Sequence, residues 1–185
     1  MRRRVCVAAL AGTLLAAAAQ APARALPACV QRLAQPAREL GSGKLRWFGL
    51  SVYDATLWSG PAGIDASALG SQALALRLRY ARSIGGAELA DASAKLMRGQ
   101  ASPQELQHWR QRMRAVFPDV HPGNTLCGVY LPHAASGPTT QFLAAGKLLG
   151  SIDGEDFARA FFGIWLGPHA THAQLRRELL AGAGP

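Results

Sequence analysis

The segment from Ser151 to Gly167 places the strongest constraint on how this chain can fold. Its last eleven residues contain four large aromatic and two aliphatic side chains. From Phe157 onward, large apolar residues recur at i, i+4 and i+7, which is the spacing of one helical face. Asp153 precedes this run and is expected to cap the helix. We therefore predict a helix that is buried in a core or along an apolar pocket.

The first 25 residues have the pattern of an export signal. Three arginines at positions 2–4 precede an apolar stretch over 5–19, and Ala23-Arg24-Ala25 fits a cleavage site. The apolar stretch is too short and too rich in alanine for a stable membrane span. We predict a signal peptide over 1–25, a single domain over 26–185 and a periplasmic location. A retained membrane anchor is the alternative.

The charge of the exported part argues against nucleic-acid binding. Removing the four arginines of residues 1–25 leaves 16 basic and 11 acidic residues, a net charge of +5. No DNA-reading motif accompanies this mild excess. His169 and His172 are three residues apart, but no Cys or carboxylate adjoins them, so we expect no metal site. The sequence also lacks a phosphate loop and a dinucleotide fingerprint, and we expect no cofactor.

Two cysteines remain after the predicted cleavage, Cys29 and Cys127. An exported protein occupies a compartment that permits disulfides. A bridge between them would tie the N-terminal tail to a central strand. The alternative is that Leu26-Pro-Ala-Cys29 is a lipoprotein processing site with a lipidated Cys29.

Runs of strands and helices alternate along the chain, which favours an α+β class: an antiparallel sheet with a layer of helices on one face. Alternating apolar residues predict half-buried strands, and Ser102-Pro-Gln-Glu105 is a capping box that starts a helix. We predict one long strand over 45–57 with a bend at Gly49. The other expected elements are strands over 74–80 and 125–131, helices over 87–98, 102–116 and 172–180, and a hairpin over 141–152 that turns at 144–147.

Two segments resemble one known family. The run from Asp156 to Gly167, Asp-Phe-Ala-Arg-Ala-Phe-Phe-Gly-Ile-Trp-Leu-Gly, is similar to the C-terminal helix of chalcone-isomerase-like proteins. The run from Gly41 to Trp58 resembles the family's Gly-x-Gly-x-x-Arg motif and the Val-Tyr-Asp strand after it. With weaker matches at 76–84 and 117–123, the resemblance spans about 40–180. It implies the chalcone-isomerase fold, with a ligand cleft between sheet and helices, which fatty-acid-binding members of the family also share.

Arginine and tyrosine side chains on apolar strands are the candidate contacts for a ligand in such a cleft. An arginine can hold a carboxylate through two parallel hydrogen bonds, and a tyrosine hydroxyl can add a third. Our leading hypothesis is an exported binding protein for a fatty acid or similar small amphipathic ligand. The alternative for Arg77 and Arg79 is the outer, solvated face of the sheet. The candidate head-group contacts are Arg46, Tyr53, Arg79 and Tyr80, and the candidate chain contacts are Phe157, Phe161 and Trp165.

The enzymatic members of this family cyclise a chalcone to a flavanone without a cofactor. An arginine stabilises the developing negative charge, and Arg46 is the candidate for that role. The chain departs from the enzymatic pattern, because Phe48 stands where the family has a threonine and no equivalent of its Asn or Tyr/Lys pair is evident. Two alternatives to a binding protein stay open: an isomerase acting on an enone or phenolic substrate, and a structural or partner-binding protein whose cleft is filled by side chains.

Overall fold

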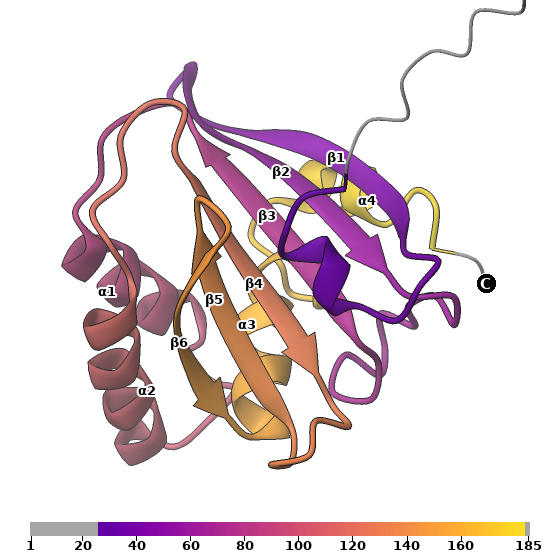
Figure 1. Cartoon of the computed structure of the whole chain (residues 1–185). Helices are drawn as coiled ribbons and strands as arrows, with labels where there is room; N and C mark the ends of the chain where they lie inside the picture. Colours follow the sequence, from indigo (N-terminus) through magenta and orange to yellow (C-terminus); the bar gives the residue numbers. More distant parts are fainter. Residues whose placement is uncertain (1–25, 184–185) are drawn as a thin grey trace, which may run out of the picture.

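The computed structural model describes residues 26–183. Six strands form one antiparallel sheet in the order β1 to β6, so that each strand pairs with the next one in the sequence (Figure 1). The predicted α+β class is confirmed. The strands are β1 (Arg38–Trp47), β2 (Leu50–Ser59), β3 (Leu74–Tyr80), β4 (Thr125–Leu131), β5 (Thr139–Ala144) and β6 (Lys147–Asp153). The helices are α1 (Gly86–Leu96), α2 (Pro103–Val116), α3 (Glu155–Leu166) and α4 (Ala173–Leu179).

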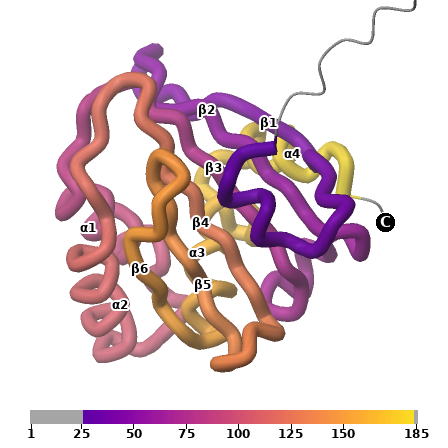
Figure 2. Tube along the Cα trace, viewed as in Figure 1, coloured from indigo at the N-terminus to yellow at the C-terminus, as the bar shows by residue number. Residues whose placement is uncertain are grey.

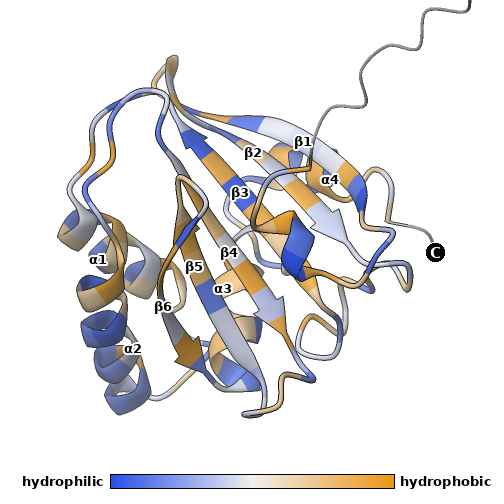
Figure 3. Cartoon of the chain, in the orientation of Figure 1, coloured by the Kyte–Doolittle hydropathy of each residue, from blue (hydrophilic) through white to orange (hydrophobic). Residues whose placement is uncertain are grey.

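The helices and the N-terminal segment cover opposite faces of the sheet. Helices α3 and α4 lie on one face, α4 against β1 and β2 and α3 against β5 and β6, while α1 and α2 pair beside β6. The segment 26–37, which includes the short 3₁₀ helix Val30–Arg32, crosses the other face (Figure 2). Strand β3 alternates between apolar and basic residues in the way that its sequence predicts (Figure 3). Leu74, Leu76 and Leu78 therefore enter the main core under the helices.

The predicted long strand over 45–57 is wrong, because the chain reverses in the middle of it. Trp47 pairs with Leu50, and the two residues between them form the turn of a β-hairpin. Phe48 has φ 47° and Gly49 has φ 78°. Positive φ at both central residues is the signature of a type I′ turn, whose twist matches that of the flanking strands. The faces predicted for residues on either side of the turn change accordingly.

Phenylalanine at position 48 makes this turn less stable than a residue that tolerates positive φ would make it. A non-glycine residue in the left-handed region costs about 1–2 kcal/mol, and asparagine tolerates it best. Phe48→Asn would give the Asn-Gly pair that two-residue hairpins prefer. We expect it to raise the free energy of unfolding by about 0.5–1 kcal/mol, measured by urea denaturation. An unchanged or lower value would contradict this account of the turn.

The helix boundaries follow from local chemistry. The predicted capping box at Ser102 is present: the Ser102 hydroxyl accepts from the Glu105 N–H, and the Glu105 carboxylate accepts from the Ser102 N–H. The predicted cap of the aromatic helix is wrong. Gly154, at φ 106°, precedes α3, and no side chain caps that helix. Asp153 ends β6 instead, where its carboxylate accepts a hydrogen bond from the Thr139 hydroxyl.

Two glycines of β1 allow α4 to lie directly on the sheet. A Cβ atom on Gly41 would come within 2.0 Å of the Glu178 carbonyl oxygen, and one on Gly43 within 2.8 Å of a Leu175 methyl carbon. Real Cβ atoms do not approach so closely, so any side chain here would push the helix away. The contact explains why the motif of this segment needs Gly-x-Gly.

A disulfide joins Cys29 to Cys127 of β4, with a Cα–Cα distance of 6.4 Å. It anchors a second, smaller core in which Val30 and Leu33 pack on Trp58 and Val129, on the sheet face opposite α3 and α4. The predicted signal peptide lies outside the described residues. Among residues 26–183, every helix is too short or too polar to cross a bilayer.

Candidate functional site

The structure brings five of the seven predicted contact residues together where α3 meets the sheet. The Trp165 indole N–H donates to the Tyr53 hydroxyl at 2.9 Å, and the Tyr53 and Tyr80 rings meet edge to face at 5.9 Å. The Phe161 ring contacts Trp165 at 5.4 Å. Phe157 stacks on Phe161 one turn earlier. Strand alternation and the helical period thus bring these five residues into one continuous aromatic layer between sheet and helices.

A small void borders this layer. Its volume is about 50 Å³, which is room for about one water molecule. Burial raises the pKa of Tyr53 to about 12, although the hydrogen bond from Trp165 works in the opposite direction. The phenol is therefore protonated at neutral pH and accepts from the indole. The void is lined by Leu45, Tyr53, Leu96, Ile164, Trp165, Thr171, His172 and Leu175.

The Tyr53–Trp165 hydrogen bond should have a measurable effect on stability. Tyr53→Phe leaves the buried Trp165 N–H without its acceptor, which costs about 1–3 kcal/mol of unfolding free energy. In the double variant Tyr53→Phe, Trp165→Phe both partners are gone. We expect it to lose at least about 1 kcal/mol less unfolding free energy than the two single variants lose in sum. A double-mutant cycle in urea measures it. Strict additivity would show that the bond contributes nothing.

The two predicted arginines do not lie with the tyrosines. Arg46 is exposed beside the β1–β2 turn, at an irregularity of the strand register. Arg79 is exposed and pairs in register with Asp54. It alternates with Leu78 and Tyr80, which face the helices, so Arg79 is on the opposite face of the sheet. Neither arginine lines the void next to Tyr53. The predicted grouping of arginine and tyrosine around one head group is not formed in this conformation.

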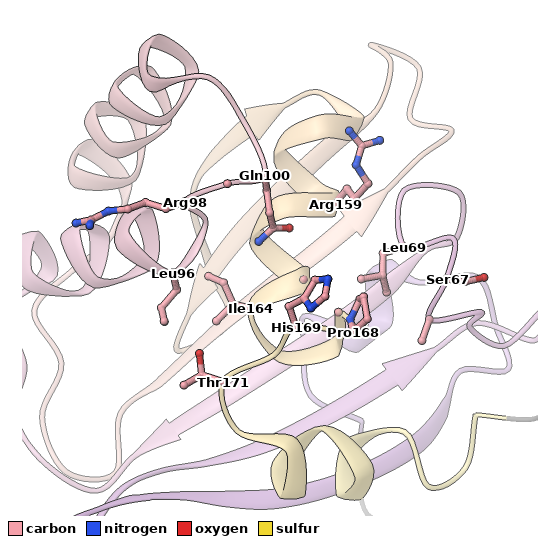
Figure 4. A pocket seen from close by; sticks show the side chains of 14 residues that line it. Ser67, Leu69, Leu96, Arg98, Gln100, Arg159, Ile164, Pro168, His169 and Thr171 are labelled. Carbon is pink, nitrogen blue, oxygen red and sulfur yellow. The ribbon is translucent and has the colours of Figure 1, made fainter.

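A larger cavity lies on the outer side of α3. Its volume is about 540 Å³ (Figure 4), within the range of about 300–1,000 Å³ that is typical of small-molecule sites. Four segments far apart in the sequence form it: the loop before β3, the end of α1 with the residues after it, the exposed side of α3 and the loop between α3 and α4. They contribute Ala66, Ser67, Leu69, Leu96, Arg98, Gly99, Gln100, Arg159, Gly163, Ile164, Gly167, Pro168, His169 and Thr171.

The charge of this cavity has one sign. Two arginines and a histidine line it, and none of its fourteen lining residues is acidic. Arg98 and Arg159 lie on either side of Gln100 with their guanidinium groups pointing away from each other, and the Gln100 side chain points toward His169 (Figure 4). Arg159 forms an ion pair with Asp156 on the exposed surface of α3. Within residues 26–183, the Arg98 guanidinium has no hydrogen bond or ion pair.

The outer cavity and the inner void share one wall. Leu96, Ile164 and Thr171 line both of them. Leu96 keeps 46% of its surface exposed although it is a large apolar residue. A ligand in the outer cavity would therefore meet an apolar surface that continues toward the Tyr53–Trp165 layer.

The polar part of the outer cavity is what the sequence analysis missed. Arg159 lies inside the aromatic run that marked the family resemblance, but its role there was not evident. Arg98 and Gln100 follow a helix end and carry no local pattern. Among residues 26–183, no group of three or more His, Cys, Asp or Glu side chains could hold a metal ion.

The meander sheet with its helix layer and a cavity beside the buried aromatic helix defines a chalcone-isomerase-type fold. A family model described as chalcone isomerase-like matches residues 40–181. The chain belongs to this family, as its motifs predicted.

One sequence relative and one solved structure illustrate the range of the similarity. An uncharacterized protein of Haemophilus influenzae is 27% identical over 142 residues, a match that covers 76% of this chain and 66% of that protein. The chain thus spans just under two thirds of that relative's length. The crystal structure of a fatty-acid binding protein of Arabidopsis thaliana has a TM-score of 0.58 and 14% identity, and it covers 82% of this chain and 90% of that one. The second likeness concerns the fold alone.

Proposed function

We propose that this protein binds a small amphipathic carboxylate, such as a fatty acid, with its head group in the outer cavity. The carrying observation is a 540 Å³ cavity that is lined by two arginines and no acidic residue and that shares an apolar wall with the aromatic layer. The Arabidopsis protein of the same fold is a fatty-acid binding protein, which supports the choice of ligand class.

The head group would lie next to Gln100, and the Arg98 and Arg159 side chains, which point outward on either side of it (Figure 4), would turn toward the ligand. A guanidinium can donate two parallel hydrogen bonds to a carboxylate, and the Gln100 amide beside them adds another donor. Arg98 is the stronger candidate because it has no acidic partner among residues 26–183, whereas Arg159 is paired with Asp156. That pair is exposed and weak, so a carboxylate ligand can replace Asp156 as the partner.

The apolar chain of the ligand would lie along Leu96 and Ile164. Covering these side chains removes apolar surface from water, which contributes about 25 cal/mol for each Å². The chain end would point toward the inner void next to Tyr53 and Trp165. The aromatic layer at Phe157 and Phe161 then supports the wall from behind instead of contacting the ligand, in contrast to the role that the sequence analysis gave it.

Binding is a better proposal than isomerisation because of the space next to the tyrosines. The void of about 50 Å³ between sheet and helices has no room for a planar two-ring substrate. The exposed arginines at 46 and 79 are not placed to stabilise charge inside it. Turnover of a 2′-hydroxychalcone no faster than in buffer is the expected result.

Titration of the delipidated chain with oleate tests the proposal. We expect saturable binding by calorimetry, and we expect Arg98→Gln with Arg159→Gln to weaken it by at least about tenfold, because charge-assisted hydrogen bonds to the head group are lost. The matched control is Arg177→Gln, an exposed arginine of α4 whose guanidinium donates to the Gln174 side chain of its own helix. Thr171→Trp, on the shared wall, should also weaken binding.

Two results would contradict the outer cavity as the site. Unchanged affinity in the double arginine variant would remove both arginines from the head-group site. Loss of binding in Arg46→Ala with no loss in the double variant would instead favour the site at the β1–β2 end that the sequence suggested. Circular dichroism of each variant separates loss of binding from loss of folding.

We also propose that the protein works after export to the periplasm. The arginine and apolar pattern of residues 1–25 supports this, as does a disulfide, which is rare in reducing compartments. Intact-mass measurement of the protein isolated from its native host is expected to show a chain that begins at Leu26, with both remaining cysteines oxidised. A full-length chain recovered from the cytoplasm would overturn the proposal.

A further inference from the structure

The tip of the β1–β2 hairpin exposes a group of large apolar side chains, which we call the hairpin tip: Trp47, Phe48 and Leu50. Their exposed fractions are 54%, 90% and 66%. The Trp47 and Phe48 rings meet edge to face at 5.2 Å, so they form one joint surface. The hairpin ends at the edge of the molecule, at the end of the sheet where β3 also ends (Figures 1 and 3).

Packing accounts for Trp47 only in part, through its edge-to-face contact with His172, and it does not account for an apolar residue at position 48. Phe48 is in the left-handed region, where a phenylalanine is unfavourable, and its ring is almost fully exposed, so packing does not compensate. A turn of this type is usually built from asparagine, aspartate or glycine. Large exposed apolar patches on a soluble domain generally mark an interaction surface.

Basic side chains surround the hairpin tip. Arg46 is exposed and, within residues 26–183, its guanidinium has no hydrogen bond or ion pair. Arg82 is also exposed and lies next to the hairpin, because the Ala81 N–H bonds to the Val52 carbonyl at 2.9 Å. Of the nearby acids, Asp54 is paired with Lys44, and Asp119 accepts the Gly86 N–H. Asp119 keeps its negative charge in that hydrogen bond, but the guanidinium groups of Arg46 and Arg82 outnumber it, so the net charge beside the apolar tip is positive.

We propose that the hairpin tip inserts into the surface of an anionic lipid bilayer. The tip protrudes at the end of the hairpin (Figure 1), so it can enter a deformable lipid surface. Tryptophan prefers the interface between lipid and water, and basic residues next to it are attracted to acidic head groups, by about 1 kcal/mol for each Lys or Arg. Phe48 and Leu50 enter the apolar part, while Arg46 and Arg82 contact phosphate groups. This surface is separate from the outer cavity and does not rest on the proposed ligand.

The tryptophans of the chain supply an internal probe for this contact. The chain has four, and Trp58, Trp109 and Trp165 are buried, so Trp47 is the one that solvent and lipid can reach. The test adds vesicles of phosphatidylcholine and phosphatidylglycerol, in about a 3:1 ratio, to the full chain. We expect a blue shift of the emission and protection of Trp47 from acrylamide, both weakened by salt. Residues 1–25 contain no tryptophan, so binding through them alone would leave this signal unchanged.

Variants identify the residues responsible. Phe48→Asn keeps and improves the turn, so its loss of vesicle binding, by about tenfold, would not come from unfolding. Arg46→Gln should weaken binding by about fivefold and only to the anionic vesicles. The matched control is Leu148→Ala, a half-exposed leucine on the β5–β6 hairpin, which should change nothing.

Three outcomes would overturn the proposal. One is sedimentation with vesicles while Trp47 stays open to acrylamide, and another is equal binding of Phe48→Asn and the unmodified chain. The third is Trp47 protected by a co-purified protein but never by vesicles, which would make the hairpin tip a protein-docking surface.

Discussion

Replacing Cys29 and Cys127 together with alanine is expected to lower the free energy of unfolding by about 4 kcal/mol. The bond closes a loop of 98 residues, and the chain-entropy model assigns about 4–5 kcal/mol to a loop of this length. Both cysteines are buried, and alanine introduces no polar group in their place. Urea denaturation of the unmodified chain, its reduced form and the double variant measures the effect.

The reduced chain is the matched control for this experiment, because it keeps both side chains and loses only the covalent bond. It should unfold at nearly the same urea concentration as the double variant. A loss below about 1 kcal/mol in both forms would show that the N-terminal segment is held by its packing of Val30 and Leu33 and gains little from the bond.

Gly41→Ala is expected to cost about 3 kcal/mol, the upper part of the usual range for overpacking. The added Cβ would meet the Glu178 carbonyl oxygen at 2.0 Å and the Leu179 carbonyl at 2.7 Å. These are backbone atoms, so the conflict cannot be relieved by a side-chain rotation, and α4 must move off β1. For a chain of this size the loss corresponds to a fall in Tm of about 6–12 °C.

Ser42→Ala is the control for that substitution. It changes the neighbouring residue of the same strand, whose side chain is exposed. We expect a change within about 0.5 kcal/mol, as for most surface positions. Equal Tm values for the two variants would mean that α4 is not seated on Gly41, and hydrogen exchange over residues 173–179 would then show whether the helix is docked at all.

The sequence was most informative where one local pattern decides the structure. The alternation in 74–80 and the capping box at Ser102 each specify an element through contacts within a few residues. The β1–β2 hairpin was missed because apolar residues continue through it, and because Phe48 occupies a turn position where asparagine or glycine would have marked the reversal. Asp153 was misplaced because a cap and a strand end have the same sequence signal.

In the candidate site, too, the features set by local patterns could be predicted and those that depend on the whole fold could not. The sequence could place three aromatic residues on facing surfaces, because strand and helix periods fix which faces they occupy: Tyr53, Tyr80 and Trp165. The outer cavity could not be predicted, since its wall is made of four segments between 66 and 171 whose meeting depends on the whole fold. The face of Arg46 depended on the turn at 48–49, which the pattern of apolar residues did not reveal, whereas the alternation in 74–80 already offered the outer face for Arg79 as an alternative.

The seating of α4 on β1 has a consequence for the order in which the chain can fold. Strand β1 is an edge strand, and the Gly41–Gly43 surface under it is covered by the last helix; the Gly182 N–H also donates to the Leu40 carbonyl. Among the described elements, the first strand to be synthesised therefore obtains its cover from α4, the helix that is synthesised after all the others. A nascent chain therefore keeps Gly41 and Gly43 uncovered until residues 173–182 have been made, after all six strands are available for pairing.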